Sequence, residues 1–170
     1  MAESKIQTVP NPSRVGSDTS TLRRDPNRLF GKGASVIRAA ALGDLGSQRD
    51  LRAACYHRIT APAASDVWLV DLAMIEGLVL ARLCAAHGDE TDARALAAYL
   101  LLGASIVNEI GTEQFTNLAE NYGAEALSIL EDLACVGDEE AAVNANSLIA
   151  LLPPQVLEKA QRLSRLEVIT

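Results

Sequence analysis

Aromatic residues make up only 4% of this 170-residue sequence, although 49% of its residues are hydrophobic. Alanine and leucine supply most of the hydrophobic content, and the β-branched and aromatic residues that favour strands are few. Alanine and leucine have high helix propensities because they lose little rotamer freedom in a helix. We therefore predict an all-α fold of five to seven helices, arranged either as a helical bundle or as a short α-helical repeat array.

The sequence has few cysteines, no secretion signal that we recognise and no long uncharged apolar run. The three cysteines are an odd number, which argues against a disulfide framework and favours a reducing, cytoplasmic compartment. The most apolar stretch, residues 68–86, contains Asp71, Glu76 and Arg82. A membrane span there would bury three charges, so we predict a central buried helix and no membrane association.

The net charge of −7 hides a division along the chain. Residues 1–58 carry ten basic and five acidic side chains, a net charge of +5, and residues 59–170 carry five basic and 17 acidic side chains, a net charge of −12. Residues 1–33 are also rich in proline, glycine and serine, which interrupt any helical periodicity. We predict a flexible, extended basic N-terminal arm over residues 1–33 and an α-helical domain over residues 34–170.

The arm contains a basic cluster with a short apolar anchor. Within the cluster, Asp25 is the only acidic residue, and the arm lacks the interleaved aromatics of a single-strand nucleic-acid binder. Because the rest of the chain is acidic, we expect a protein partner or further copies of this chain, and we do not expect nucleic acid. The residues predicted to contact that partner are Arg23, Arg24, Arg28, Phe30 and Lys32.

Helix start and stop signals divide the remainder of the chain. Ser65 or Asp66 is predicted to cap the third helix, Asp89 with Asp92 the fourth and Thr112 the fifth, which Gly123 is expected to bend or break. The predicted helices cover about residues 36–41, 48–58, 66–87, 90–110, 113–136, 139–152 and 155–166.

Three of the predicted helix junctions share a Gly-Asp pair. Gly43-Asp44, Gly88-Asp89 and Gly137-Asp138 recur at spacings of 45 and 49 residues. Glycine adopts the left-handed conformation that closes a helix, and aspartate accepts hydrogen bonds from the free amides of the next helix. The recurrence has two interpretations, which are duplicated repeats and independent use of the same capping solution.

Residues 127–151 resemble one armadillo or HEAT repeat. In this stretch Gly137-Asp138-Glu139-Glu140 separates two apolar helices, and the run from Asn144 to Ile149 follows. The stretch 37–55 through Gly43-Asp44 is similar but shorter, whereas the unequal unit spacing, the irregular connection at 59–64 and Gly111 depart from the family pattern. The resemblance implies stacked helix pairs with a groove for a peptide or another protein, and it brings no catalytic residue.

The sequence offers two pairs of residues for metal or nucleophilic chemistry. Cys55 with His57, and Cys84 with His87, each place a thiol near an imidazole, but neither has the paired spacing of a structural zinc site. No third orienting group accompanies either pair, as a catalytic cysteine would need. We expect Cys84 to pack in the core, and we predict no metal.

Other polar motifs also have structural interpretations. The segment Gly31-Lys32-Gly33-Ala34-Ser35 lacks the spacing of a phosphate-binding loop and is interpreted as a hinge. The paired carboxylates fall at predicted helix starts, where they cap helices and favour solubility. We predict no enzyme activity and no cofactor.

Two functions remain open from the sequence. The first is a non-enzymatic protein–protein interaction module, such as an adaptor, chaperone-like protein or scaffold, whose basic arm is used in assembly. The alternative is a structural subunit of a large assembly, such as a phage particle or secretion apparatus, in which the arm joins neighbouring subunits.

Overall fold

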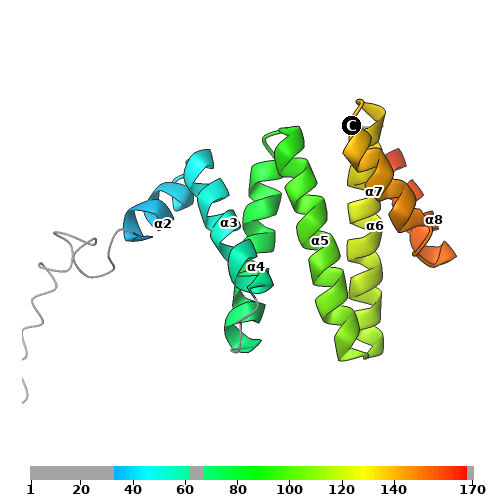
Figure 1. Cartoon of the computed structure of the whole chain (residues 1–170), viewed down its shortest axis with the longest axis horizontal. Coiled ribbons are helices and arrows are strands. Elements are labelled where there is room, and N and C mark those ends of the chain that lie inside the picture. The colour runs from blue at the N-terminus through cyan, green and yellow to red at the C-terminus, as the bar shows by residue number, and fades with distance from the viewer. Residues whose placement is uncertain (1–32, 62–66, 168–170) are drawn as a thin grey trace, which may run out of the picture. The chain divides into compact units, whose positions relative to one another are not determined.

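The computed structural model describes residues 33–61 and 67–167, and the secondary structure of these residues is entirely helical. The prediction of an all-α fold is confirmed (Figure 1). The chain divides into two units between Ser35 and Val36, and we call the second unit the helical body. The seven described helices are α2 (Gly33–Ala41), α3 (Leu45–Thr60), α4 (Val67–Ala85), α5 (Glu90–Ile110), α6 (Glu113–Cys135), α7 (Glu139–Ile149) and α8 (Pro154–Glu167).

The three Gly-Asp junctions are confirmed as tight joints between helices. Gly43, Gly88 and Gly137 have φ angles of 91°, 79° and 102°, a left-handed conformation that a side chain would strain. The aspartate after each glycine caps the following helix, since Asp44 accepts from Ser47 N, Asp89 from Thr91 N and Asp138 from Ala141 N. The joints therefore connect α2 to α3, α4 to α5 and α6 to α7.

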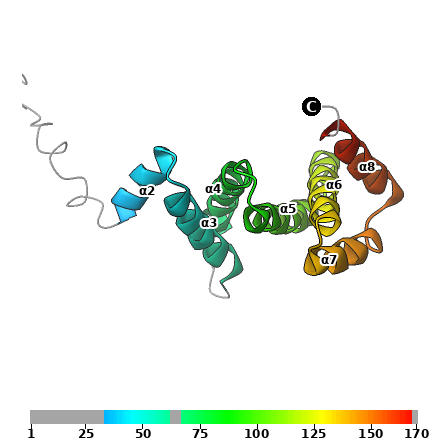
Figure 2. The ribbon, with the colours of Figure 1, turned by 90° about the horizontal axis from the view of Figure 1, so that it is seen from above.

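Each helix packs mainly against helices that are close to it in the chain. From α3 to α6, each helix contacts the next, and α6 contacts both α7 and α8. Figure 2 shows α7 and α8 on two different sides of α6. Such sequential contacts mean that the buried core extends along the series of helices.

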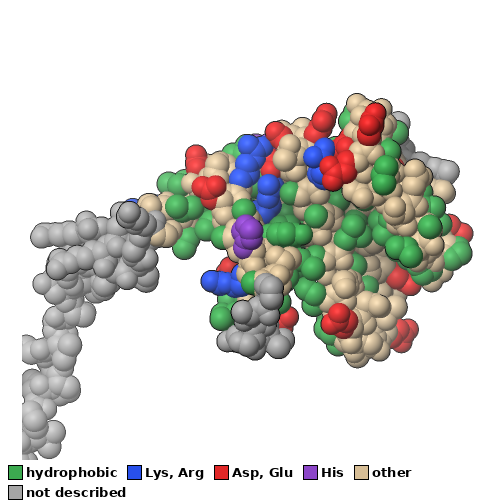
Figure 3. All heavy atoms as spheres, viewed as in Figure 1, with side chains coloured by type: hydrophobic (Ala, Val, Ile, Leu, Met, Phe, Trp, Pro, Cys, Tyr) green, Lys and Arg blue, Asp and Glu red, His purple; other side chains and the backbone are tan. Residues whose placement is uncertain are grey.

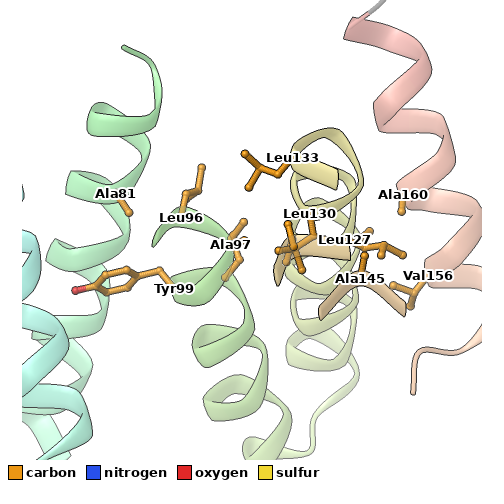
Figure 4. Close-up of a cluster of buried hydrophobic side chains, with 14 of the residues drawn as sticks. Ala81, Leu96, Ala97, Tyr99, Leu127, Leu130, Leu133, Ala145, Val156 and Ala160 are labelled. Atoms are coloured by element: carbon orange, nitrogen blue, oxygen red, sulfur yellow. The ribbon is translucent and has the colours of Figure 1, made fainter. Parts of the chain in front are cut away.

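The core is built from leucine and alanine with one buried tyrosine. In Figure 4, Tyr99 points from α5 toward α4, while Leu127, Ala145 and Val156 gather where α6, α7 and α8 meet. Tyr99 and Leu127 are almost fully buried. Small alanine side chains let the helix backbones approach closely, which explains how a chain with so few aromatics fills its core.

The structure corrects the prediction that residues 68–86 form a central buried helix. Helix α4 buries its small side chains, such as Ala73 and Ala81, and exposes most of its large apolar ones. Helix α5 takes the central place between α4 and α6. By length and composition α5 would be able to cross a membrane, but core helices meet the same criterion, so this is weak support for a span.

The expectation that Gly123 breaks a helix is wrong. Helix α6 runs unbroken through Gly123, and an added Cβ there would lie 3.3 Å from Leu152 Cδ2. Its small size therefore serves packing. The predicted helix start at Thr112 is confirmed, because Thr112 directly precedes α6 and has the extended backbone conformation of a cap, although its side chain makes no capping hydrogen bond. The predicted cap at Ser65 or Asp66 lies outside the described residues.

Candidate functional site

A fully buried carboxylate joins α3 to α5 near the start of α5. Asp92 is 0% exposed and accepts hydrogen bonds from Arg49 Nε at 2.9 Å, Arg49 Nη2 at 2.5 Å and Arg52 Nη1 at 2.6 Å. Arg49 Nη2 also lies 3.2 Å from Asp89 Oδ2. The hydrogen bonds from Arg49, followed by those from Arg52, hold the pKa of Asp92 below its ordinary value despite burial. This arrangement, the Arg49–Asp92 cluster, fixes the position of α3 on α5.

Two further ion pairs connect helices in the same way. Arg82 on α4 binds Glu125 on α6 with both terminal nitrogens, at 2.5 and 2.7 Å. Arg94 on α5 binds Asp138, the capping residue of α7. The bond from Ala141 N, and then the Arg94 guanidinium, lower the pKa of Asp138. The Arg49–Asp92 and Arg82–Glu125 pairs both span 43 residues, and the Arg94–Asp138 pair spans 44.

Tyr99 provides a second connection between α3, α4 and α5. Its hydroxyl donates to the carbonyl oxygen of Arg52 at 2.5 Å, and its ring meets Tyr56 edge-on at 5.7 Å between centroids. An added Cβ at Gly77 of α4 would lie only 2.4 Å from Tyr99 Cε1. Burial raises the pKa of Tyr99, so the hydroxyl stays protonated and donates this bond across the physiological range.

A hollow of about 400 Å³ lies between α5, α6 and α7. Ala97, Leu101 and Leu148 contribute to its apolar wall, and Arg94, Glu140, Asn144 and Ser147 give it a polar rim. Arg94 is positioned by its bond to Asp138, so the cap of α7 also orders one edge of the hollow.

A second hollow, of about 270 Å³, lies between α3 and α5 and is bordered by Tyr56, His57, Ala95 and Tyr99. Ala98 is exposed on α5 and borders both hollows. We call the two together the α5 groove. It exists because α5 presents alanine methyl groups here, whereas the flanking helices carry larger side chains. In Figure 3, hydrophobic surface lines a hollow in the middle of the face that it shows, with Lys and Arg side chains along one edge.

The chemistry of the α5 groove suits binding. An apolar floor would accept apolar side chains. The amide of Asn144 offers a donor and an acceptor to the backbone of a bound segment, and the Ser147 hydroxyl, which donates to Val143 O, offers an acceptor. The acidic and basic side chains along it are Arg52, Arg94, Glu140 and His57, and both arginines are engaged in ion pairs. No paired nucleophile and base lies among the residues that border the groove.

The structure also places the cysteine and histidine candidates. Cys84 is fully buried, as predicted, and burial raises its pKa, which disfavours the reactive thiolate. Cys55 is half-buried and its pKa is also raised by burial, while His57 is exposed at the groove. Within residues 33–61 and 67–167, no group of three or more His, Cys, Asp or Glu side chains is placed to hold a metal ion.

The residues predicted to contact a partner fall outside this region. Arg23, Arg24, Arg28, Phe30 and Lys32 all lie outside the described residues. The groove residues were not anticipated from the sequence, because alanine on a helix gives no signal of whether it faces a neighbour or a hollow. The arginine–carboxylate pairs recur at separations of 43 and 44 residues, but the sequence alone does not show which of its many charged residues form pairs.

Comparison with known proteins adds no relative. No protein-family profile matches the sequence, and no curated protein or solved structure matches it.

Proposed function

We propose that this chain is a non-enzymatic protein-interaction module whose α5 groove binds a segment of another protein. The observation that carries the proposal is the groove itself, with an apolar floor and a polar rim on a rigid frame of helices. The Arg49–Asp92 cluster and the Arg94–Asp138 pair fix α3 and the start of α7, which border the groove, to α5. A groove held in this way binds without reorganising, which lowers the entropic cost of binding.

The helical body is proposed to be a short repeat array of the armadillo or HEAT type. Three features support this: the three joints share one geometry, consecutive helices pack in series, and the ion pairs recur at separations of 43 and 44 residues. In such an array each unit contacts its neighbours, and an extended surface forms along equivalent helices. Helices α3, α5 and α7 are the equivalent helices here, and the α5 groove lies along them.

The basic segment is proposed to act in assembly. Arg23, Arg24, Arg28 and Lys32 oppose the −12 charge of residues 59–170, so contact between the segment and the acidic surface of another molecule is electrostatically favourable. The proposed setting is cytoplasmic, with no cofactor and no membrane.

Peptide selection tests the groove. The full chain is used to select binders from a displayed library of random peptides, and each binder is measured against Ala98→Trp, which fills the point where the two hollows meet. The control is Ala54→Trp, at an exposed alanine of α3 that borders neither hollow.

The proposal expects selected peptides that lose at least tenfold in affinity for Ala98→Trp and bind Ala54→Trp as they bind the original chain. Peptides that bind Ala98→Trp with unchanged affinity would overturn it. A selection that enriches no peptide above background would also overturn it.

A further inference from the structure

Helix α4 exposes an apolar stripe that the helical body leaves uncovered. Trp68, Leu72, Ile75, Val79 and Leu83 follow one another at spacings of four, three, four and four residues, which places them on one face of the helix. Each of these side chains is between 41% and 73% exposed, and Leu69 beside them is 42% exposed. We call this set the α4 stripe. An apolar patch of this length is typical of an interaction surface.

The α4 stripe faces away from the core of the helical body. The residues that α4 buries, among them Ala73, Gly77, Ala81 and Cys84, occupy its opposite side. Gly77 lies against Tyr99 of α5. The stripe is therefore separate from the α5 groove, and neither surface depends on the other for its ligand.

The charged side chains beside the stripe indicate which partner, and in which orientation, would pack on it. Asp71 and Arg82 are eleven residues apart, so they lie on the same flank of α4 about three turns from each other. Both are exposed, and Arg82 retains 47% side-chain exposure while it binds Glu125. A parallel copy of α4 would place Asp71 on Asp71 and Arg82 on Arg82. An antiparallel copy places Asp71 opposite Arg82 twice.

The apolar residues agree with the same antiparallel register. When the two helices are centred at position 77, Ile75 faces Val79 of the second copy, and Leu72 lies within one residue of the position opposite Leu83. In this register Asp71 also lies within one residue of the position opposite Arg82 of the second copy. Trp68 falls beside Ala86, a small exposed residue that leaves room for the indole.

We propose that the α4 stripe is a homodimer interface, on which α4 of a second copy packs antiparallel in this register. A two-fold axis relates the copies, so each contact occurs twice. Glu76 lies on the other flank of α4 and approaches its own equivalent near the axis. This like-charge contact weakens the dimer, so Glu76→Gln is expected to tighten it a few-fold.

Sedimentation equilibrium of the full chain tests the interface. The proposal expects a reversible dimer in the micromolar range that persists at 1 M NaCl, since apolar contact and not the basic arm holds it. Ile75→Asp is expected to raise the dissociation constant at least 100-fold. The control is Val143→Asp on α7, because Val143 is as exposed as Ile75, at 64% each, and lies off the stripe. Circular dichroism confirms that both variants keep their helix content.

Cysteine cross-linking tests the register. On a Cys135→Ser background, a mixture of Ile75→Cys and Val79→Cys chains is expected to form disulfides faster than either chain alone, because the two positions face each other. A parallel pair would favour Ile75→Cys alone and would overturn the register.

Three other outcomes overturn the dimer. The first is a chain that remains monomeric, with the Ile75→Cys thiol protected from reagent, which would show that the chain covers its own stripe. The second is a monomer with a freely reactive thiol, which would leave the stripe to a foreign partner. The third is an Ile75→Asp chain that still dimerises. None of these bears on the α5 groove, so the failure of one proposal is distinguishable from the failure of the other.

Discussion

Replacing Asp92 by asparagine is expected to remove the principal polar connection between α3 and α5. The carboxylate is 0% exposed and is held by two guanidinium groups, so the change leaves positive charge without its counterion. Breaking a buried ion pair in this way typically costs about 3–5 kcal/mol. Here the Arg49 side chain is 38% exposed and still lies near Asp89, so water and Asp89 compensate part of its charge in the variant. The expected loss in the free energy of unfolding is therefore about 2–3 kcal/mol.

The dependence on pH provides a second signature of the same interaction. Because the pKa of Asp92 is lowered in the folded state, its stabilisation is present above the ordinary aspartate pKa of about 3.9 and is lost as the pH falls through the folded value. The amide that replaces the carboxylate in Asp92→Asn does not titrate. The stability difference between the two proteins should thus be constant from about pH 5 to 7 and shrink below about pH 4.

Urea denaturation followed by far-ultraviolet circular dichroism measures both effects. Trp68 is a poor probe of unfolding, because it is already 73% exposed in the folded chain. The control is Glu158→Gln, which removes the exposed Glu158–Arg162 pair and should change stability by no more than about 0.5 kcal/mol. Two results would refute the assignment of Asp92 as a buried, ionised connection. One is a loss of unfolding free energy in Asp92→Asn as small as that of the control. The other is a stability difference between Asp92→Asn and the original chain that stays constant down to pH 2.

Three further outcomes follow from the packing. Gly77→Ala should destabilise the fold by about 1–3 kcal/mol in the same urea assay, because its Cβ would lie 2.4 Å from Tyr99 Cε1. The control Gly46→Ala, whose Cβ would lie 3.6 Å from Asp44 Oδ2, should be neutral or stabilising, and equal stability changes in the two variants would contradict the close contact of Gly77 with Tyr99. Tyr99→Phe should cost about 0.5–1.5 kcal/mol through loss of the bond to Arg52 O, and a neutral result would argue against that bond. A thiol reagent should label exposed Cys135 fast and buried Cys84 only upon unfolding; fast labelling that survives the double change Cys55→Ser and Cys135→Ser would contradict the burial of Cys84.

The features that sequence reasoning predicted well are those determined by a few adjacent residues. The Gly43-Asp44, Gly88-Asp89 and Gly137-Asp138 joints were recognisable because backbone conformation at glycine and capping by aspartate are local effects. The order of the helices followed from these joints.

The features that it missed depend on contacts between distant parts of the chain. Asp92 was predicted as part of a cap, since an acid in the first turn of a helix has that role by default, but arginines 40 and 43 residues earlier in the chain make it a buried counterion instead. Likewise, apolarity predicted a buried α4, whereas the structure buries its small side chains and Met74 and leaves most of its large apolar side chains exposed. The α5 groove arises from packing between helices, so no single segment encodes it.

Chemical-shift mapping on the ¹⁵N-labelled full chain tests the central claim most directly. A peptide selected by the chain is titrated in, and the amide signals that move are assigned. Binding in the α5 groove predicts that the largest shifts occur in α5 from Ala95 to Leu101 and in the facing residues Asn144 to Leu151, and that they vanish with Ala98→Trp. Shifts confined to the α4 stripe or to α8, with the α5 groove unperturbed, would contradict the claim.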